Sequence, residues 1–102
     1  MRIMLACCAG MSTSLVVSKM IEAAKAQGKD DYKIWAVDQT EIQPQLGEFD
    51  VLLLGPQVRH IQRKVRKIVG DDFPMDIIES VAYGTCNGAA VLKQAENLLG
   101  VK

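Results

Sequence analysis

Residues 3–14 read Ile3-Met4-Leu5-Ala6-Cys7-Cys8-Ala9-Gly10-Met11-Ser12-Thr13-Ser14, an apolar run that leads through two cysteines into a small, hydroxyl-rich segment. The apolar run predicts a buried strand from Arg2 to Ala6. A helix is predicted to start between Met11 and Ser14 and to run to about Gln27, before Gly28. A strand that passes through a short turn into a helix is the opening of a βαβ unit, so this stretch favours a parallel sheet.

The rest of the chain repeats this alternation. Three more strands are predicted at Tyr32–Val37, Val51–Leu54 and Met75–Ile78. The helices between and after them are predicted at Glu41–Leu46 with Thr40 as a cap, from Pro56 to Val69, and from Asn87 or Gly88 to Leu99. We therefore expect a single α/β domain over residues 1–102, with a four-stranded parallel sheet in the order 2-1-3-4 and helices on both faces.

Cys7 is predicted to lie at the ligand-binding edge of this sheet. In open parallel sheets ligands bind beyond the carboxyl ends of the strands, beside the first strand. Backbone N–H groups of a turn before a helix converge on an anion, and the same positive potential favours a thiolate over a thiol. We predict that Cys7 takes and passes on a phosphoryl group. The predicted phosphate loop is Cys8, Ala9, Gly10, Met11, Ser12, Thr13 and Ser14.

Three further residues are candidates to flank the phosphate or to contact a partner. Pro56 and Gln57 follow the third predicted strand, and Tyr83 follows the fourth. Their alternative roles are capping and packing. Cys86 is expected to fill a structural niche and His60 to be exposed, so neither is a candidate ligand or carrier. No cluster has zinc-ligand spacing, and we expect no metal and no cofactor.

The loop lacks the arginine that cysteine phosphatases place at the sixth position after the nucleophile, where this chain has Thr13. This favours a phosphocysteine that waits for an acceptor over rapid hydrolysis. A small cysteine phosphatase or an arsenate-reductase-like enzyme is the main alternative. A receiver-like module is disfavoured because Asp50 precedes the third strand. A redox module built on Cys7 and Cys8 is a further alternative.

The balance of charges limits the kinds of partner that we expect for this chain. Twelve basic and twelve acidic residues balance, which argues against nucleic acid as a ligand. The predicted third helix is locally basic, which is typical of a solvated face or, alternatively, of a surface for an acidic partner.

Three cysteines, two of them adjacent, suit a reducing compartment, and the apolar run before Cys7 is too short for a secretory signal. We expect a cytoplasmic protein.

Cys7 through Ser14, followed by Leu15-Val16-Val17-Ser18-Lys19-Met20, resembles the IIB component of the bacterial sugar phosphotransferase system, in the lactose, cellobiose and chitobiose group. The segments Leu53–Gln57, Tyr83-Gly84 and Val91–Lys93 match as well. The resemblance covers the whole chain and implies a flavodoxin-like fold similar to that of small cysteine phosphatases. Position 8 departs from the family, because Cys8 stands where a small residue such as serine is usual.

The resemblance implies a phosphocarrier with two protein partners. In this family a IIA protein donates a phosphoryl group from histidine to the cysteine of IIB, here Cys7. The cysteine then passes it to a sugar, here expected to be a disaccharide, that is bound by the membrane-embedded IIC component. A monomer is expected, because such a carrier alternates between its partners.

Overall fold

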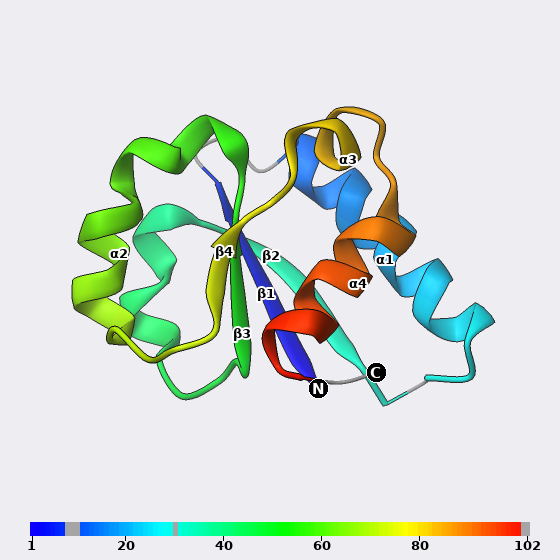
Figure 1. Ribbon diagram of the computed structural model, residues 1–102, viewed down its shortest axis with the longest axis horizontal. Coiled ribbons are helices and arrows are strands. Elements are labelled where there is room, and N and C mark those ends of the chain that lie inside the picture. The colour runs from blue at the N-terminus through cyan, green and yellow to red at the C-terminus, as the bar shows by residue number, and fades with distance from the viewer. Residues whose placement is uncertain (8–10, 30, 101–102) are drawn as a thin grey trace.

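The computed structural model describes residues 1–7, 11–29 and 31–100, which form a three-layer α/β/α arrangement (Figure 1). The central sheet contains β1 (Arg2–Cys7), β2 (Lys33–Asp38), β3 (Val51–Leu54) and β4 (Met75–Ile77). All neighbouring strands pair in parallel, in the order β2-β1-β3-β4. The predicted sheet, its order and its helix-covered faces are confirmed.

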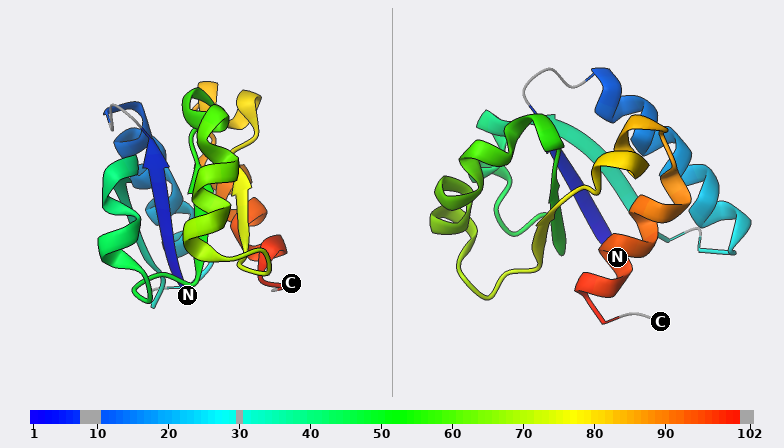
Figure 2. Two further views of the ribbon diagram at one scale, coloured as in Figure 1. Left: turned by 90° about the vertical axis from the view of Figure 1, so that its left-hand side faces the viewer. Right: turned by 45° about the horizontal axis from the view of Figure 1, so that its top comes forward.

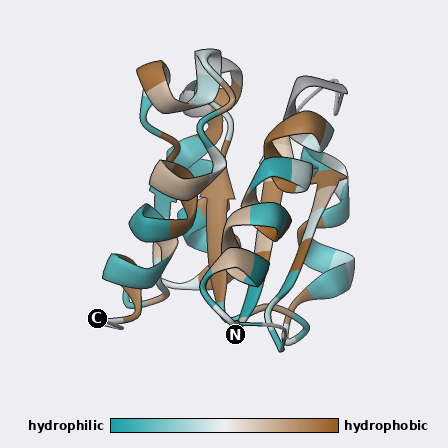
Figure 3. Ribbon diagram, turned by 90° about the vertical axis from the view of Figure 1, so that its right-hand side faces the viewer, coloured by the Kyte–Doolittle hydropathy of each residue, from teal (hydrophilic) through white to brown (hydrophobic). Residues whose placement is uncertain are grey.

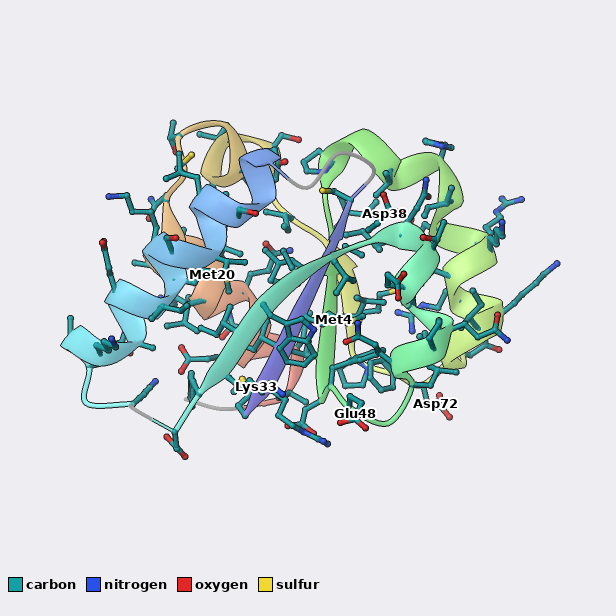
Figure 4. The ribbon with its side chains drawn as sticks, turned by 180° about the vertical axis from the view of Figure 1, so that it is seen from behind. Met4, Met20, Lys33, Asp38, Glu48 and Asp72 are labelled. Atoms are coloured by element: carbon teal, nitrogen blue, oxygen red, sulfur yellow. The ribbon has the colours of Figure 1, made fainter. Side chains whose placement is uncertain are left out.

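The alternation of side chains along β1 builds two separate cores. Ile3 and Leu5 lie in a core with the inner sides of α1 (Met11–Ala26) and α4 (Gly88–Leu98). Met4 and Ala6 point to the opposite face, where α2 (Gln62–Val69) and the segment after β2 cover the sheet. Both faces of the central strands are therefore buried, which explains their continuous apolar sequence (Figure 3). Figure 4 labels one methionine from each core, Met4 and Met20.

The segment after β2 differs from the predicted helix over 41–46. It forms two 3₁₀ turns, η1 (Gln39–Glu41) and η2 (Gln43–Gln45), which lie beside α2 on one side of the molecule (left view of Figure 2). Pro44 has no N–H to continue a helical ladder. The prediction that Thr40 is the cap is wrong. The cap is Asp38, whose carboxylate accepts a hydrogen bond from Thr40 N at 3.0 Å.

Two other helices differ from the prediction. The helix expected from Pro56 begins with 3₁₀ turns, η3 (Pro56–Ile61), and becomes α-helical only at Gln62, because Val58 has non-helical angles of φ −112° and ψ 22°. A short helix, α3 (Ser80–Gly84), was not predicted. Its cap is Glu79, whose carboxylate accepts from Ala82 N at 2.8 Å. Glutamate is a weak cap signal in a sequence.

α1 and α4 approach closely at one glycine. A Cβ placed on Gly88 would lie 2.2 Å from the carbonyl carbon of Lys19 and 2.4 Å from the nitrogen of Met20. Asn87 caps α4 through a bond of 3.2 Å from Ala90 N to its side-chain oxygen, which agrees with the predicted helix start. The close approach at Gly88 places the first turn of α4 against the middle of α1.

Candidate functional site

Cys7 is the last residue of β1 and is 1% exposed. Side chains alternate along a strand, so Cys7 faces the same side as Ile3 and Leu5, which is the side covered by α1. Its neighbour Ala6 accepts a hydrogen bond from Gly55 N at 2.9 Å, which ties the end of β1 to the end of β3. The thiol therefore lies in a fixed position at the carboxyl edge of the sheet.

The N-terminus of α1 lies at this same edge (Figure 1). The helix begins at Met11, so the N–H groups of Met11, Ser12 and Thr13 have no acceptor within the helix. Such groups, together with the positive end of the helix dipole, form a site for a phosphate or another oxyanion. The first turn of α1 contains no acidic residue that would weaken this potential.

The predicted phosphate loop is covered only in part. Cys8, Ala9 and Gly10 lie outside the described residues, as do the side chains of Met11, Ser12 and Thr13. Ser14 lies in the first helical turn and is exposed. Its carbonyl accepts a bond from the hydroxyl of Ser18 at 3.3 Å. The structure thus places the backbone of residues 11–14 at the edge where Cys7 ends its strand.

Two of the three predicted flanking residues lie at this edge as well. Pro56 is the half-buried first residue of η3, and Tyr83 is a half-buried residue of α3. η3 lies near the end of β1, and α3 lies beside the first turns of α1 (Figure 1). Gln57 belongs to η3 by its backbone, and its side chain lies outside the described residues.

α3 is held at this edge by Gln94 of α4. The side-chain amide of Gln94 donates to Ile77 O at 2.7 Å and to an oxygen of Asp76 at 3.1 Å. Its oxygen accepts from Glu79 N at 3.1 Å, immediately before α3. Gln94 therefore links β4, α3 and α4. The sequence offers no local signal for this role, since the bonded residues are 15 to 18 positions away.

Asp38 is a site neighbour that the sequence analysis did not single out. It is the register partner of Cys7 in the ladder between β1 and β2 (Figure 4 labels Asp38 at the end of β2). Its carboxylate accepts from both Thr40 N and Thr40 Oγ1 at 3.0 Å. Its position at the end of a strand next to the first strand is the signal that would have found it.

His60 and Cys86 were predicted to be neither ligands nor carriers. His60 is exposed, as expected. Cys86 is half-buried, contacts the core on the α1 side and has a positive φ of 52°. In the parts of the chain that the structure describes, no group of three or more His, Cys, Asp or Glu residues is arranged to hold a metal ion. None of the described helices is both long and apolar enough to cross a bilayer.

Comparison with known proteins shows which family the chain belongs to. A family profile described as "PTS system, Lactose/Cellobiose specific IIB subunit" matches residues 2–94. The chain belongs to this family. It is 49% identical over 105 residues to the "PTS system galactose-specific EIIB component" of Lactococcus lactis subsp. cremoris, covering 95% of this chain and 94% of the relative. It is 35% identical over 99 residues to the "PTS system oligo-beta-mannoside-specific EIIB component" of Bacillus subtilis, covering 96% and 95%.

Two solved IIB structures share the fold of this IIB chain. The cellobiose-specific IIB component of Borrelia burgdorferi is 37% identical, with a TM-score of 0.79, over 96% of this chain and 90% of that one. The lactose-specific IIB domain of Streptococcus pneumoniae is only 15% identical, with a TM-score of 0.75, over 97% and 94%. The second likeness supports the fold alone. The chain is thus a IIB-type component of a sugar phosphotransferase system.

Proposed function

We propose that this IIB protein is a cytoplasmic phosphoryl carrier that uses Cys7 as its phosphorylated residue. The observation that carries the proposal is the burial of the Cys7 thiol at the end of β1, on the side of the sheet where α1 begins. A phosphoryl group on that sulfur would meet the backbone N–H groups of Met11, Ser12 and Thr13, which have no acceptor within the helix. Phosphoryl transfer depends mainly on such positioning and charge stabilisation.

The first proposed step loads the carrier. The Cys7 sulfur, as a thiolate, attacks the phosphorus of a phosphohistidine on a IIA protein. The new P–S bond forms as the P–N bond breaks, and the imidazole leaves as a neutral base after taking up the proton that the thiol has lost. The loop of residues 8–14 would hold the three phosphoryl oxygens through N–H and hydroxyl groups.

The second proposed step unloads the carrier. A hydroxyl oxygen of a sugar bound by the membrane IIC component attacks the same phosphorus. The P–O bond forms as the P–S bond breaks, which returns Cys7 to its thiolate form, and the hydroxyl proton leaves to solvent or to a base on IIC. Three relatives are named for galactose, cellobiose and oligo-beta-mannoside, and the last two names favour a β-linked disaccharide or oligosaccharide as acceptor.

The carrier role is tested by following the phosphoryl group. The protein is charged by a labelled donor relay that contains a lactose/cellobiose-type IIA protein, then purified and mixed with vesicles that contain IIC and cellobiose. We expect the label to leave the protein and appear in a sugar phosphate. Rapid hydrolysis of an aryl phosphate by the free protein would instead indicate a cysteine phosphatase, for which Thr13 in place of arginine is unfavourable.

A further inference from the structure

A groove between α2 and the 3₁₀ turns after β2 is lined by none of the residues predicted for the phosphoryl site. Its volume is about 410 Å³. One wall is formed by Gln39, Thr40 and Gln43, and the opposite wall by Ile61, Lys64, Val65 and Ile68. The left view of Figure 2 shows the two segments that form these walls side by side. We name this feature the α2 groove.

The helical wall of the α2 groove is basic. Residues 56–69 contain no aspartate or glutamate. Arg63, Lys64 and Lys67 are exposed on α2, and Lys64 also lines the groove. Glu41 is the one carboxylate of residues 39–46, and it does not line the groove. The α2 wall of the groove is therefore positive, whereas Asp38 and Glu41 belong to the segment of the opposite wall, in a chain whose formal net charge is zero.

These cations have no carboxylate partner in the part of the chain that the structure describes. The ion pairs found there are Arg2–Asp50, Lys19–Glu22 and Lys29–Glu96. Arg66 is different, because its guanidinium donates to backbone carbonyls of the segment after α2. That clamp fixes the end of α2, while Arg63, Lys64 and Lys67 remain available to a partner.

The α2 groove begins close to the functional edge of the sheet. Gln39 and Thr40 directly follow Asp38, which is the register partner of Cys7. A protein centred over Cys7 could therefore extend a segment into the groove. The apolar side chains of Ile61 and Ile68 would contact an aliphatic residue, and Lys64 and Lys67 would meet carboxylates next to it.

We propose that the α2 groove docks an acidic segment, with an aliphatic anchor residue, of the phosphoryl donor protein. This rests on the proposed function for the identity of the partner. The donor is favoured over IIC because it carries a doubly charged phosphoryl group, whereas the cytoplasmic loops of membrane proteins are enriched in lysine and arginine. A confined groove also suits a protein segment better than a flat lipid surface.

The test compares two double charge reversals that change the net charge equally. The test variant is Lys64→Glu with Lys67→Glu, on α2. The control is Lys25→Glu with Lys93→Glu, where Lys25 lies in the last turn of α1, as Lys67 does in α2, and Lys93 is an exposed residue of α4. Thermal unfolding followed by circular dichroism shows that each variant is folded.

The measured quantity is the second-order rate constant for transfer from phosphorylated IIA to each protein. We expect the test variant to be slower than wild type by about tenfold or more at low ionic strength, with a loss that shrinks as salt is added. The control should stay within about twofold, and so should transfer from the charged test variant to sugar in IIC vesicles. Addition of IIA to labelled protein should shift the amide resonances of Thr40, Gln43 and Ile68.

Three results would overturn the docking proposal. Equal rates for the test and control variants would show that the basic face is only solvated. Equal slowing of the donor and sugar steps would remove its assignment to the donor. Binding to vesicles of anionic phospholipid that is lost in the test variant, with an unchanged donor step, would assign the face to the membrane. Failure of wild type to accept any phosphoryl group would instead contradict the proposed function.

Discussion

Cys7 and Asp38 form the last pair of the parallel ladder between β1 and β2, so a carboxylate lies beside the residue that we propose to be phosphorylated. That carboxylate is directed by two hydrogen bonds into the turn that starts the α2 groove. One residue thus connects the end of the sheet, the phosphoryl site and the proposed docking surface.

Replacing Asp38 separates its capping role from its charge. Asp38→Ala removes the acceptor for Thr40 N and Thr40 Oγ1 and should lower the free energy of unfolding by about 1 kcal/mol. Asp38→Asn keeps an acceptor oxygen and should remain within about 0.5 kcal/mol of wild type. Urea unfolding measures both. Equal destabilisation by the two substitutions would show that the charge, not the cap, stabilises the turn.

Gly88 should not tolerate even one methyl group. A Cβ there would overlap backbone atoms of Lys19 and Met20. Backbone atoms within a helix cannot move aside as the end of a flexible side chain can. We expect Gly88→Ala to destabilise the protein by about 1–3 kcal/mol, as overpacking of a close contact does. Gly84→Ala is the matched control, since its Cβ would meet nothing within 4 Å. A thermal midpoint for Gly88→Ala equal to that of Gly84→Ala would contradict the close approach of α1 and α4.

Arg66 should be the one cation of α2 that matters for stability. Its Nη1 donates to Phe73 O at 2.6 Å and to Gly70 O and Asp71 O at 3.2 Å, and its Nη2 donates to Met75 O at 3.2 Å. Arg66→Ala leaves these carbonyls without their donor and should cost about 2 kcal/mol.

Arg66→Lys should recover only part of that loss, because one ammonium group does not reproduce the planar fork of a guanidinium. Arg63→Ala, an exposed neighbour, should change the free energy of unfolding by less than about 0.5 kcal/mol. Full recovery of stability by Arg66→Lys would indicate that the charge alone, and not the fork geometry, holds the segment after α2.

The acid side of the stability profile should depend on Glu96. Burial raises the pKa of Glu96, but hydrogen bonds from Lys29 and Tyr32 and the charge of Lys29 outweigh it and hold the pKa below its ordinary value of 4.5. A carboxyl group with a lowered pKa in the folded state stabilises the protein above its unfolded pKa, and that stability is lost as the pH falls through the folded pKa.

Glu96→Gln should therefore lower the free energy of unfolding at pH 7, by about 1–3 kcal/mol. The difference from wild type should shrink progressively below about pH 4.5. Asp50, whose pKa is also lowered, by hydrogen bonds from Arg2, is present in both proteins and so cancels in the comparison. A difference that stays constant between pH 7 and pH 3 would show that Glu96 acts by packing and not by its charge.

The periodicity of the sequence predicted the sheet well, because Ile3–Ala6 and Val51–Leu54 are apolar on both faces and such strands belong in the middle of a parallel sheet. It did not predict α3, whose five residues are positioned by Gln94 from a distant helix. Local sequence patterns do not predict hydrogen bonds between residues that are far apart in the chain. The same limit applies to Arg66, which as a sequence looks like one more solvated cation.

Part of the candidate site was likewise predicted from local sequence patterns, and part was not. The position of Cys7 at the carboxyl edge and the start of α1 at Met11 followed from the strand-to-helix pattern around them. Asp38 was missed because the second strand was predicted to end at Val37, whereas β2 includes Asp38 and pairs it with Cys7. The roles of Cys7, of the loop residues 8–14 and of Pro56, Gln57 and Tyr83 in phosphoryl transfer stay predictions.

Whether Cys7 carries the phosphoryl group is decided by the intact mass of the protein after incubation with a phosphoenolpyruvate-charged relay that includes a lactose/cellobiose-type IIA protein. Wild type, Cys7→Ser and Cys8→Ser are compared. We expect one added phosphoryl group on wild type and on Cys8→Ser, and none on Cys7→Ser. A phosphoryl group on Cys7→Ser, or its absence from Cys8→Ser alone, would contradict the assignment of Cys7 as the carrier.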